Sequence, residues 1–386
     1  MNLRFLSVTT LISESGCTAE LSDYLKSFEA TSVFLVTDAG IDKLGLAEPA
    51  IKSLESAGLR VTVDTQVTAD PAEEQILKIA EQAREVDADL IIGFGGGSSM
   101  DAAKLVALLA HPHQTQTIEQ MYGVDQVTGN RLPLIQIPTT AGTGSEVTPV
   151  AIVTRPDQTK SGVVSSKLIA DMALLDADLT LGLPRHITAE TGIDAMVHAI
   201  EAYTSKRLKN PISDMHAIKA LQLIHSALPK VLSQGADQAA RGDMLLGACL
   251  AGQAFANAPV AAVHALAYPL GARYHLAHGL TNALVLLKVL EFNLSHASSL
   301  YAELFAALEP DQARGQSVDK QAAMLIDLLH AHLSEAQIRT RLRDHGVNQR
   351  DLDSLASDAM QQTRLLINNP REMVEADARR IYAEVW

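Results

Sequence analysis

The spacing of apolar residues changes once along this chain, near residue 183, and this change limits which folds the chain can adopt. Between about residues 30 and 180, short runs of apolar and β-branched residues alternate with amphipathic stretches, a pattern typical of a parallel sheet flanked by helices. From residue 184 onward, long Ala- and Leu-rich stretches carry apolar residues at helical spacing with almost no strand pattern. We therefore predict an α/β domain over residues 1–183 and an all-helical domain over residues 184–386.

Within these domains, individual elements are expected from the local periodicity. In the first domain, the expected strands lie at residues 32–37, 60–63, 90–94 and 134–137. The expected helices of that domain lie at residues 42–56, 72–85 and 98–110. In the second domain, helices are expected around residues 193–203, 212–228, 239–256, 258–271 and 280–292.

Composition limits the kinds of partner. The chain has 386 residues, which is more than one ordinary hydrophobic core accommodates. Its 47% hydrophobic and 20% charged residues are typical of a well-packed soluble protein. The formal net charge of −14 at pH 7 argues against a nucleic acid or an anionic membrane as the main partner.

The cysteines and the N-terminal residues bear on the compartment. Cys17 and Cys249 are the only two cysteines, and neither belongs to a CxxC motif. A disulfide framework is therefore not expected, whereas a reducing cytoplasmic location is. The first residues lack the pattern of a secretory signal, and no apolar stretch approaches the ~20 residues that cross a bilayer.

Four residues of the second domain carry side chains that bind divalent metals. Asp194 and His198 are four residues apart in an expected helix, so both side chains lie on one face. His264 and His278 follow, fourteen residues apart. One carboxylate and three imidazoles suit iron(II) or zinc better than magnesium or calcium. Because the chain has 13 histidines, a chance pairing of Asp194 with His198 in a purely structural role is the alternative.

In the first domain, a glycine-rich segment joins a strand to a helix. Gly95, Gly96 and Gly97 let the backbone approach a ligand closely, and Ser98 can cap the helix, whose first amides attract a phosphate. A pyrophosphate fits here, although the sequence is not the GxGxxG fingerprint and such turns also serve tight packing alone. A second loop of small and hydroxyl residues, PTTAGTGSE at 138–146, either lines a cofactor or is an ordinary loop.

Asp38 follows the first expected strand and has two interpretations. Its carboxylate can accept hydrogen bonds from an adenosine ribose, which favours NAD over NADP because the charge repels a 2′-phosphate. It can equally cap or turn the chain before Ile41.

Taken together, these motifs resemble one family. The segments GGGSSMD, PTTAGTGSEVT, HALAYPLG and HLAHG, with the Asp194/His198 pair, are similar to those of the iron-dependent (group III) alcohol dehydrogenases. The resemblance extends to the closing NNPREMVEADARRIYAEVW. It implies an N-terminal nucleotide-binding domain, an all-helical metal-binding and catalytic domain, an active site in the cleft between them, and a homodimer.

The resemblance also implies roles for individual residues. The implied ligands of one Fe(II) or Zn(II) ion are Asp194, His198, His264 and His278. The implied NAD-binding residues are Asp38, Asp70, Gly96, Gly97, Ser98, Asp101, Thr139, Thr140, Thr143, Lys160, Leu179 and Leu183.

Three positions depart from the family pattern. Tyr268 stands where relatives often carry a histidine that relays a proton, so we expect Tyr268, or water, to take that role. Asp70 stands where several relatives have Asn, and Val150 replaces an Asn near the substrate, which suggests a less polar pocket. His275, three residues before His278, is a further candidate for the catalytic site. Phe255 either shapes the pocket or belongs to the core.

The expected activity is reversible hydride transfer between a primary alcohol and NAD, giving an aldehyde and NADH, with the metal acting as a Lewis acid on the alcohol oxygen. NADP is the less favoured cofactor. Enzymes similar to maleylacetate reductase or dehydroquinate synthase, which share the fold, are the alternatives. Loss of a metal ligand would favour a non-catalytic protein, but all four ligands are present.

Overall fold

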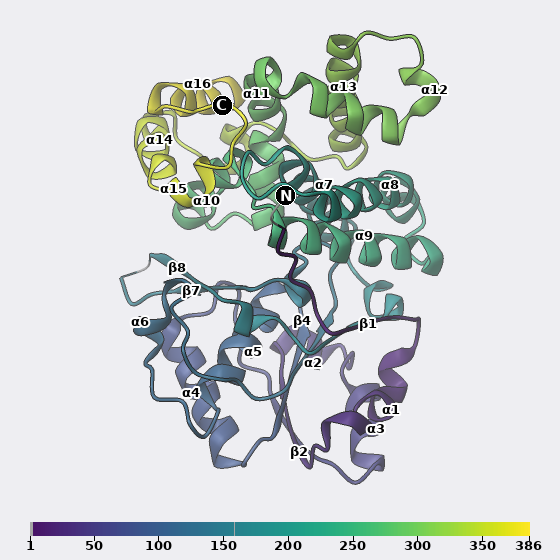
Figure 1. The fold of residues 1–386 in the computed structure, drawn as a ribbon, viewed down its shortest axis with the longest axis vertical. Helices are drawn as coiled ribbons and strands as arrows, with labels where there is room; N and C mark the ends of the chain where they lie inside the picture. Colours follow the sequence, from purple (N-terminus) through teal and green to yellow (C-terminus); the bar gives the residue numbers. More distant parts are fainter. Residues whose placement is uncertain (1–2, 158) are drawn as a thin grey trace. The chain divides into compact units, whose positions relative to one another are not determined.

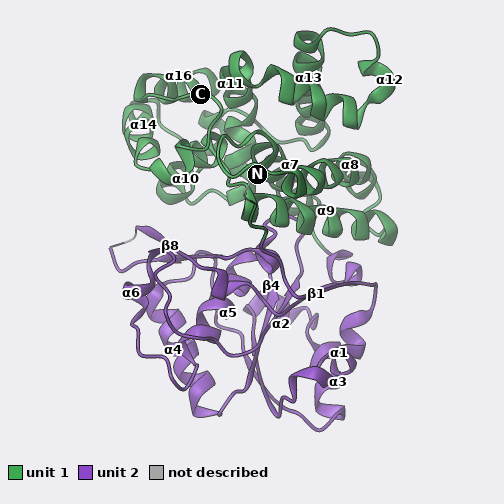
Figure 2. Ribbon diagram, viewed as in Figure 1, with its two compact units in different colours: residues 1–5, 183–386 green, residues 6–182 purple. Residues whose placement is uncertain are grey.

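The computed structural model describes residues 3–157 and 159–386, which divide into two compact units (Figures 1 and 2). One unit is Leu6–Gly182, and the other is Leu183–Trp386 with residues 3–5. The expected division after residue 183 thus lies one residue later than the observed one, and residues 3–5 belong to the helical unit instead. A reason is the ring of Phe5, whose centroid lies 5.3 Å from that of His216 in the helical unit.

The α/β unit is built on a six-stranded sheet whose neighbouring strands are all parallel. In spatial order the strands are β1 (Thr10–Ser13), β9 (Met172–Leu175), β6 (Leu134–Pro138), β4 (Leu90–Gly95), β2 (Ser32–Val36) and β3 (Arg60–Asp64). Every residue of β2, β4, β6 and β9 is buried, as expected for strands covered on both faces. The predicted parallel sheet is confirmed, whereas β1 and β9 were not expected.

The helices of this unit follow the strands. The longer ones are α3 (Glu48–Ser56), α4 (Glu73–Glu85) and α5 (Gly97–Leu109). The short elements are η1 (Cys17–Glu20), α1 (Leu21–Tyr24), η2 (Lys26–Phe28), α2 (Ala39–Lys43) and α6 (Ile118–Met121). The single helix expected at 42–56 is wrong, because Gly45 adopts φ +67° and separates α2 from α3.

A second sheet has three strands, one of which precedes β6 in the sequence while the other two lie between β6 and β9. Strands β7 (Val150–Thr154) and β8 (Lys160–Val164) form an antiparallel pair, and β5 (Gly123–Val124) runs parallel to β8. The 3-10 helix η3 (Ser145–Val147) lies between β6 and β7, and η4 (Ser166–Leu168) lies between β8 and β9. A further one, η5 (Ala177–Thr180), follows β9. The sequence pattern did not predict this hairpin, which extends the α/β unit beyond a plain alternation of strands and helices.

In the described residues, the other unit is helical, as predicted (Figure 1). Its long helices are α7 (Arg185–Thr204), α8 (Pro211–Ser233), α9 (Gln238–Asn257), α10 (Ala262–Tyr274), α11 (His278–Leu308) and α13 (Val318–Glu335). Its shorter elements are α12 (Pro310–Ala313), η6 (Leu342–His345), η7 (Gln349–Asp351), α14 (Leu352–Met360), α15 (Thr363–Leu366) and α16 (Glu375–Val385). Helix α7 packs against α8, α9 and α11, so it is buried on nearly all sides.

No single helix of the described residues is both long enough and apolar enough to cross a membrane. Only α9 and α10 taken together pass such a test, and the two are bent by 106° at the break between them.

Candidate metal centre and cofactor-binding residues

The four predicted metal ligands converge inside the helical unit. Asp194 and His198 come from α7, His264 from α10, and His278 is the first residue of α11. One ligand atom from each of the four lies within 4.8 Å of the corresponding atoms of the others. The first three residues are buried, whereas the side chain of His278 is 42% exposed. The cluster therefore lies in the core of the helical unit, and it is accessible to solvent at His278.

Close packing of helices brings His278 to the cluster. Gly279 follows His278 in the first turn of α11, and a Cβ atom there would overlap the backbone carbonyl of Glu190 on α7. Only glycine therefore lets α11 begin this close to α7.

Within the cluster, Asp194 is the electrostatic centre. Its Oδ1 lies 4.0 Å from His198 Nε2 and 3.8 Å from His278 Nε2. Burial alone would raise the pKa of Asp194, but the charges of His198, His278 and His264 and the amide of Asn282 outweigh it and lower the pKa. The carboxyl group of Asp194 is therefore ionised at neutral pH, as binding of a divalent metal requires.

Aromatic contacts fix the imidazole of His198. Its ring stacks on that of His264, with centroids 4.8 Å apart, and on that of Phe255, with centroids 4.4 Å apart. Phe255, expected either in the pocket or in the core, thus packs directly against a candidate ligand.

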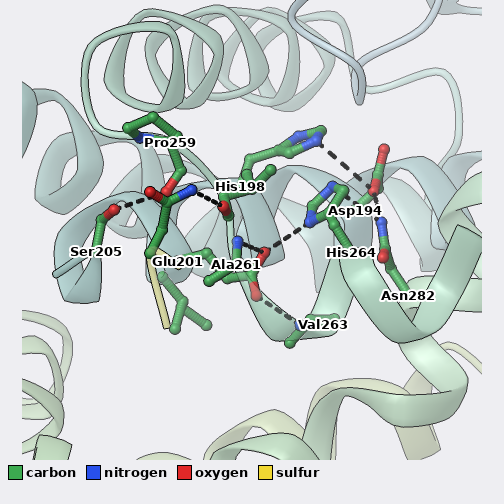
Figure 3. Close-up of polar contacts among 12 residues, drawn as sticks. Asp194, His198, Glu201, Ser205, Pro259, Ala261, Val263, His264 and Asn282 are labelled. Atoms are coloured by element: carbon green, nitrogen blue, oxygen red, sulfur yellow. Dashed lines mark hydrogen bonds and ion pairs between the residues drawn. The ribbon is translucent and has the colours of Figure 1, made fainter. Parts of the chain in front are cut away.

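Two residues around the cluster were missed by the sequence analysis (Figure 3). Glu201 accepts a hydrogen bond from His264 Nδ1 at 2.7 Å. Asn282 Nδ2 donates to Asp194 Oδ1 at 2.6 Å and lies 3.2 Å from His264 Nε2. Spacing gave a usable signal, because Glu201 follows His198 by three residues and Asn282 follows His278 by four, so each shares a helical face with a ligand.

The donors fit a single divalent ion of the iron or zinc type. A carboxylate and three imidazoles are the ligands that such ions prefer, and the hydrogen bond at His264 Nδ1 leaves Nε2 available. Such an ion binds each donor atom at about 2.0–2.2 Å, so four donor atoms within 4.8 Å of one another need only small side-chain movements to reach one ion. The structure thus brings the predicted ligand set together.

The two predicted catalytic residues, Tyr268 and His275, differ in their surroundings. The ring of Tyr268 is beside the cluster, with its centroid 5.8 Å from that of His278 and 6.4 Å from that of His264. His275 is exposed and ends α10 in a left-handed conformation with φ 54°. The ring of Tyr268 therefore lies next to two of the four predicted ligands.

In the α/β unit, the glycine segment and the second loop lie against each other. The Thr139 amide donates to the Gly95 carbonyl at 3.0 Å. A Cβ atom at Gly97 would lie 2.9 Å from Thr143 Cγ2, and one at Gly96 would lie 3.8 Å from the hydroxyl of Thr140. The predicted residues of the two cofactor loops therefore lie next to each other at the start of α5, and the first amides of a helix favour an anion.

Ser98 does not cap α5, contrary to expectation. The helix begins at Gly97 with Gly96 as its N-cap residue and no side-chain cap. The hydroxyl of Ser98 instead accepts a hydrogen bond from the Asp70 amide at 3.3 Å. The Asp70 carboxylate pairs with Lys160 at 2.6 Å. Three predicted cofactor residues thus meet beside the glycine segment.

Asp38 caps α2, which was the alternative interpretation of this residue. Its Oδ1 accepts from the amides of Gly40 at 2.8 Å and Ile41 at 3.1 Å. Its Oδ2 is 3.5 Å from the hydroxyl of Ser99 in the first turn of α5. The capping role uses one carboxylate oxygen, and a ribose contact through the other stays a prediction.

Asp101 supports the second loop from within. Its carboxylate accepts hydrogen bonds from Ser145 Oγ at 2.6 Å and from the Ile152 amide at 3.0 Å. The buried Lys104, which the sequence analysis did not single out, donates to Asp101 at 3.2 Å and to Ser145 at 2.7 Å. Burial lowers the pKa of Lys104, although Asp101 opposes that shift. Asp101 therefore helps to position the second loop, and its predicted contact with the cofactor stays a prediction.

The remaining predicted cofactor residues, Leu179 and Leu183, both contact other parts of the protein. Leu179 is 6% exposed and belongs to the apolar core of the α/β unit. Leu183 is the first residue of the helical segment, and its carbonyl accepts a hydrogen bond from Arg241 at 3.2 Å.

Two family models match the chain and together cover most of its length. Residues 9–177 match the model of iron-containing alcohol dehydrogenases, and residues 188–386 match that of the C-terminal region of the Fe-containing alcohol dehydrogenase family. The chain belongs to the iron-containing alcohol dehydrogenase family. The resemblance inferred from the motifs is confirmed, and the protein is an oxidoreductase of this family, which implies a divalent metal and NAD(H).

Individual relatives of the family agree with this result. The long-chain-alcohol dehydrogenase 1 of Geobacillus thermodenitrificans (strain NG80-2) is 39% identical over 95% of this chain and 92% of its own length. The crystal structure of a 1,3-propanediol oxidoreductase has a TM-score of 0.96 at 29% identity, with 100% of both chains covered. The sulfoacetaldehyde reductase of Bifidobacterium kashiwanohense in complex with NAD+ has a TM-score of 0.89 at 27% identity, covering 100% of this chain and 99% of its own.

Proposed function

We propose that the protein is an NAD-dependent alcohol dehydrogenase that interconverts a primary alcohol and its aldehyde. The observation that carries the proposal is the complete set of Asp194, His198, His264 and His278 within 4.8 Å of one another in a chain that matches this family along its length. Relatives named as a long-chain-alcohol dehydrogenase and a 1,3-propanediol oxidoreductase support an alcohol or aldehyde substrate.

The reaction removes two particles from the alcohol: a hydride from the carbinol carbon, which NAD accepts, and a proton from the hydroxyl group. A divalent ion held by the four ligands supplies Lewis acidity that lowers the pKa of the hydroxyl group. The anionic carboxylate of Asp194 and the packed rings of His198 and Phe255 hold this donor set rigid. Tyr268, beside His264 and His278, is the proposed group for moving the proton toward solvent.

The α/β unit supplies the cofactor contacts in this proposal. The free amides at the start of α5 and the hydroxyls of Thr140 and Thr143 receive the pyrophosphate. The acidic Asp38 favours NAD over NADP, because a 2′-phosphate would add negative charge next to its carboxylate. A NAD+ complex of the sulfoacetaldehyde reductase with the same fold supports this preference. We also propose a homodimer in the cytoplasm, with Fe(II) or Zn(II) as the metal.

The test combines metal analysis of freshly purified protein with a panel of alcohols and aldehydes, each assayed with NAD(H) and NADP(H). We expect about one divalent ion per chain and turnover of an alcohol or aldehyde with net change in NADH absorbance. The matched variant is His264→Ala, which should lose both the metal and the turnover while keeping its circular dichroism spectrum. Full turnover by a metal-free His264→Ala protein would refute the proposal, as would a protein that recycles NAD with no net NADH change.

A further inference from the structure

The carboxylate of Glu201 connects α7 to the start of α10. Glu201 lies three residues after His198 and seven after Asp194, so all three side chains project from one face of α7. Its side chain is 4% exposed. It accepts hydrogen bonds from the amide of Ala261 at 2.9 Å, from the amide of Val263 at 2.7 Å and from His264 Nδ1 at 2.7 Å (Figure 3).

We propose that Glu201 is a positioning residue that presets the tautomer and orientation of His264 and thereby sets the metal affinity of the site. The inference rests on the metal centre that the proposed function uses. Glu201 is not one of the four ligands, and it acts on the metal only through His264.

The hydrogen-bond pattern determines which nitrogen of His264 carries the proton. A carboxylate accepts and does not donate, so Nδ1 must be protonated to bond to Glu201. In a neutral ring, Nε2 then keeps its lone pair. The Asn282 amide nitrogen lies 3.2 Å from Nε2, which is the contact expected for a donor facing a lone pair. Both ends of the ring therefore specify the same tautomer, with Nε2 directed at the other ligands.

The same contacts fix the position of the ring. The amides of Ala261, the N-cap residue, and Val263 lie at the N-terminus of α10, where the helix dipole favours a negative charge. Ser205, at the end of α7, donates to the carbonyl of Pro259 at 2.7 Å and holds the preceding segment. His264 is therefore tied to the helix that carries Asp194 and His198, so three of the four ligands share one rigid support.

The experiment measures metal affinity, with Zn²⁺ and Co²⁺ each titrated against a competing chelator. Glu201→Gln preserves the shape of the side chain but replaces one acceptor oxygen with an N–H group, so it cannot serve all three donors. We expect its affinity for both ions to fall by about 10–100-fold, and the absorption bands of bound Co²⁺ to change. The matched control is Glu309→Gln. Glu309 also contacts a histidine, with its Oε1 3.1 Å from His225 Nε2, but that histidine is not one of the four ligands.

A folded Glu201→Gln protein with unchanged affinity for both ions would overturn the inference. So would an equal loss in the Glu309→Gln control, since the effect would then not be specific to His264. If Glu201 served only to cap α10, the variant would have a lower melting temperature in the metal-free state but the same metal affinity and the same Co²⁺ spectrum.

A second measurement uses the unaltered protein. Nitrogen-15 spectra of the metal-free chain labelled at histidine report which ring nitrogen is protonated, and His264→Asn identifies the relevant signals. We expect the Nδ1–H tautomer for His264 before any metal is added, and an Nε2–H tautomer would overturn the inference. Neither measurement requires an alcohol, an aldehyde or NAD. A protein without turnover therefore contradicts the proposed function alone, and an unchanged affinity contradicts this inference alone.

Discussion

Asn282 Nδ2 donates a 2.6 Å hydrogen bond to Asp194 Oδ1, at a depth where neither residue reaches solvent. The same nitrogen lies 3.2 Å from His264 Nε2 and 3.4 Å from His278 Nε2. Among the described residues, the other amide atom, Oδ1, has no hydrogen-bond partner. The side-chain amide of Asn282 thus serves as a hydrogen-bond donor to the predicted ligand atoms.

From this contact we predict that Asn282→Leu destabilises the metal-free protein. A buried carboxylate that loses its donor costs about 1–3 kcal/mol, so the free energy of unfolding in urea should fall by about that amount. Added metal should recover most of the loss, because the ion then compensates the charge of Asp194. Equal stability of the variant and the unaltered protein without metal would show that the hydrogen bond contributes nothing.

The two roles of Asp38 can be separated with two substitutions. Asp38→Asn keeps an oxygen that can cap α2 through Gly40 and Ile41 but removes the charge. We expect the ratio of kcat/KM with NADP to that with NAD to rise about tenfold, which corresponds to roughly 1.4 kcal/mol. Asp38→Ala should raise the same ratio but also lower the stability of the α/β unit by about 0.5–2 kcal/mol. If the ratio of kcat/KM with NADP to that with NAD is unchanged in both variants, Asp38 serves only to cap α2.

A steric prediction concerns the two cofactor loops. A Cβ atom at Gly97 would lie 2.9 Å from Thr143 Cγ2, so Gly97→Ala should displace Thr143 and weaken NADH binding by about tenfold. Thr143→Ser removes the conflicting methyl group, and the double variant should bind NADH more tightly than Gly97→Ala alone. The measurement is NADH fluorescence in a double-mutant cycle. Strictly additive losses would show that these residues do not meet in this way.

The sequence was enough to select the four candidate metal ligands, whereas it did not show the roles of the residues that contact them. Asp194 and His198 share one helix, and histidine and carboxylate donors are chemically distinctive. Glu201 depends on amides 60 and 62 residues further along the chain, and Asn282 on Asp194 at a separation of 88 residues. Such partners become neighbours only when α7, α10 and α11 pack, so helical spacing alone does not assign their roles.

The fold shows the same dependence on long-range contacts. Strands β2, β4 and β6 are continuous buried runs, which the apolar pattern identifies directly. Strand β1 is four residues long and has no fully buried residue, so its place beside β9 depends on pairing and not on its own pattern. The apolar spacing continues across Gly45 and predicts one helix, whereas the positive φ of this glycine separates α2 from α3.

His332, a buried histidine that is paired with the half-buried His225, makes the stability of the protein sensitive to pH. His332 is 5% exposed, and its Nε2 lies 2.8 Å from His225 Nδ1. Burial, followed by the charge of His225, lowers the pKa of His332 to about 4 from its usual 6.5. Between these values the unfolded chain binds more protons than the folded one, so stability from this group is complete above pH 6.5 and is lost as the pH falls toward 4.

The expected loss between pH 6.5 and pH 4 is about 2–3 kcal/mol, since each unit of pKa shift corresponds to about 1.4 kcal/mol. His332→Gln should therefore flatten the dependence of the unfolding free energy on pH in this window, measured by urea denaturation of the metal-free protein. His296→Gln is the control, because His296 is exposed and outside this pair. The same slope in the His332→Gln protein and the unaltered protein would mean that other groups cause the acid sensitivity and that His332 titrates alike in the folded and unfolded states.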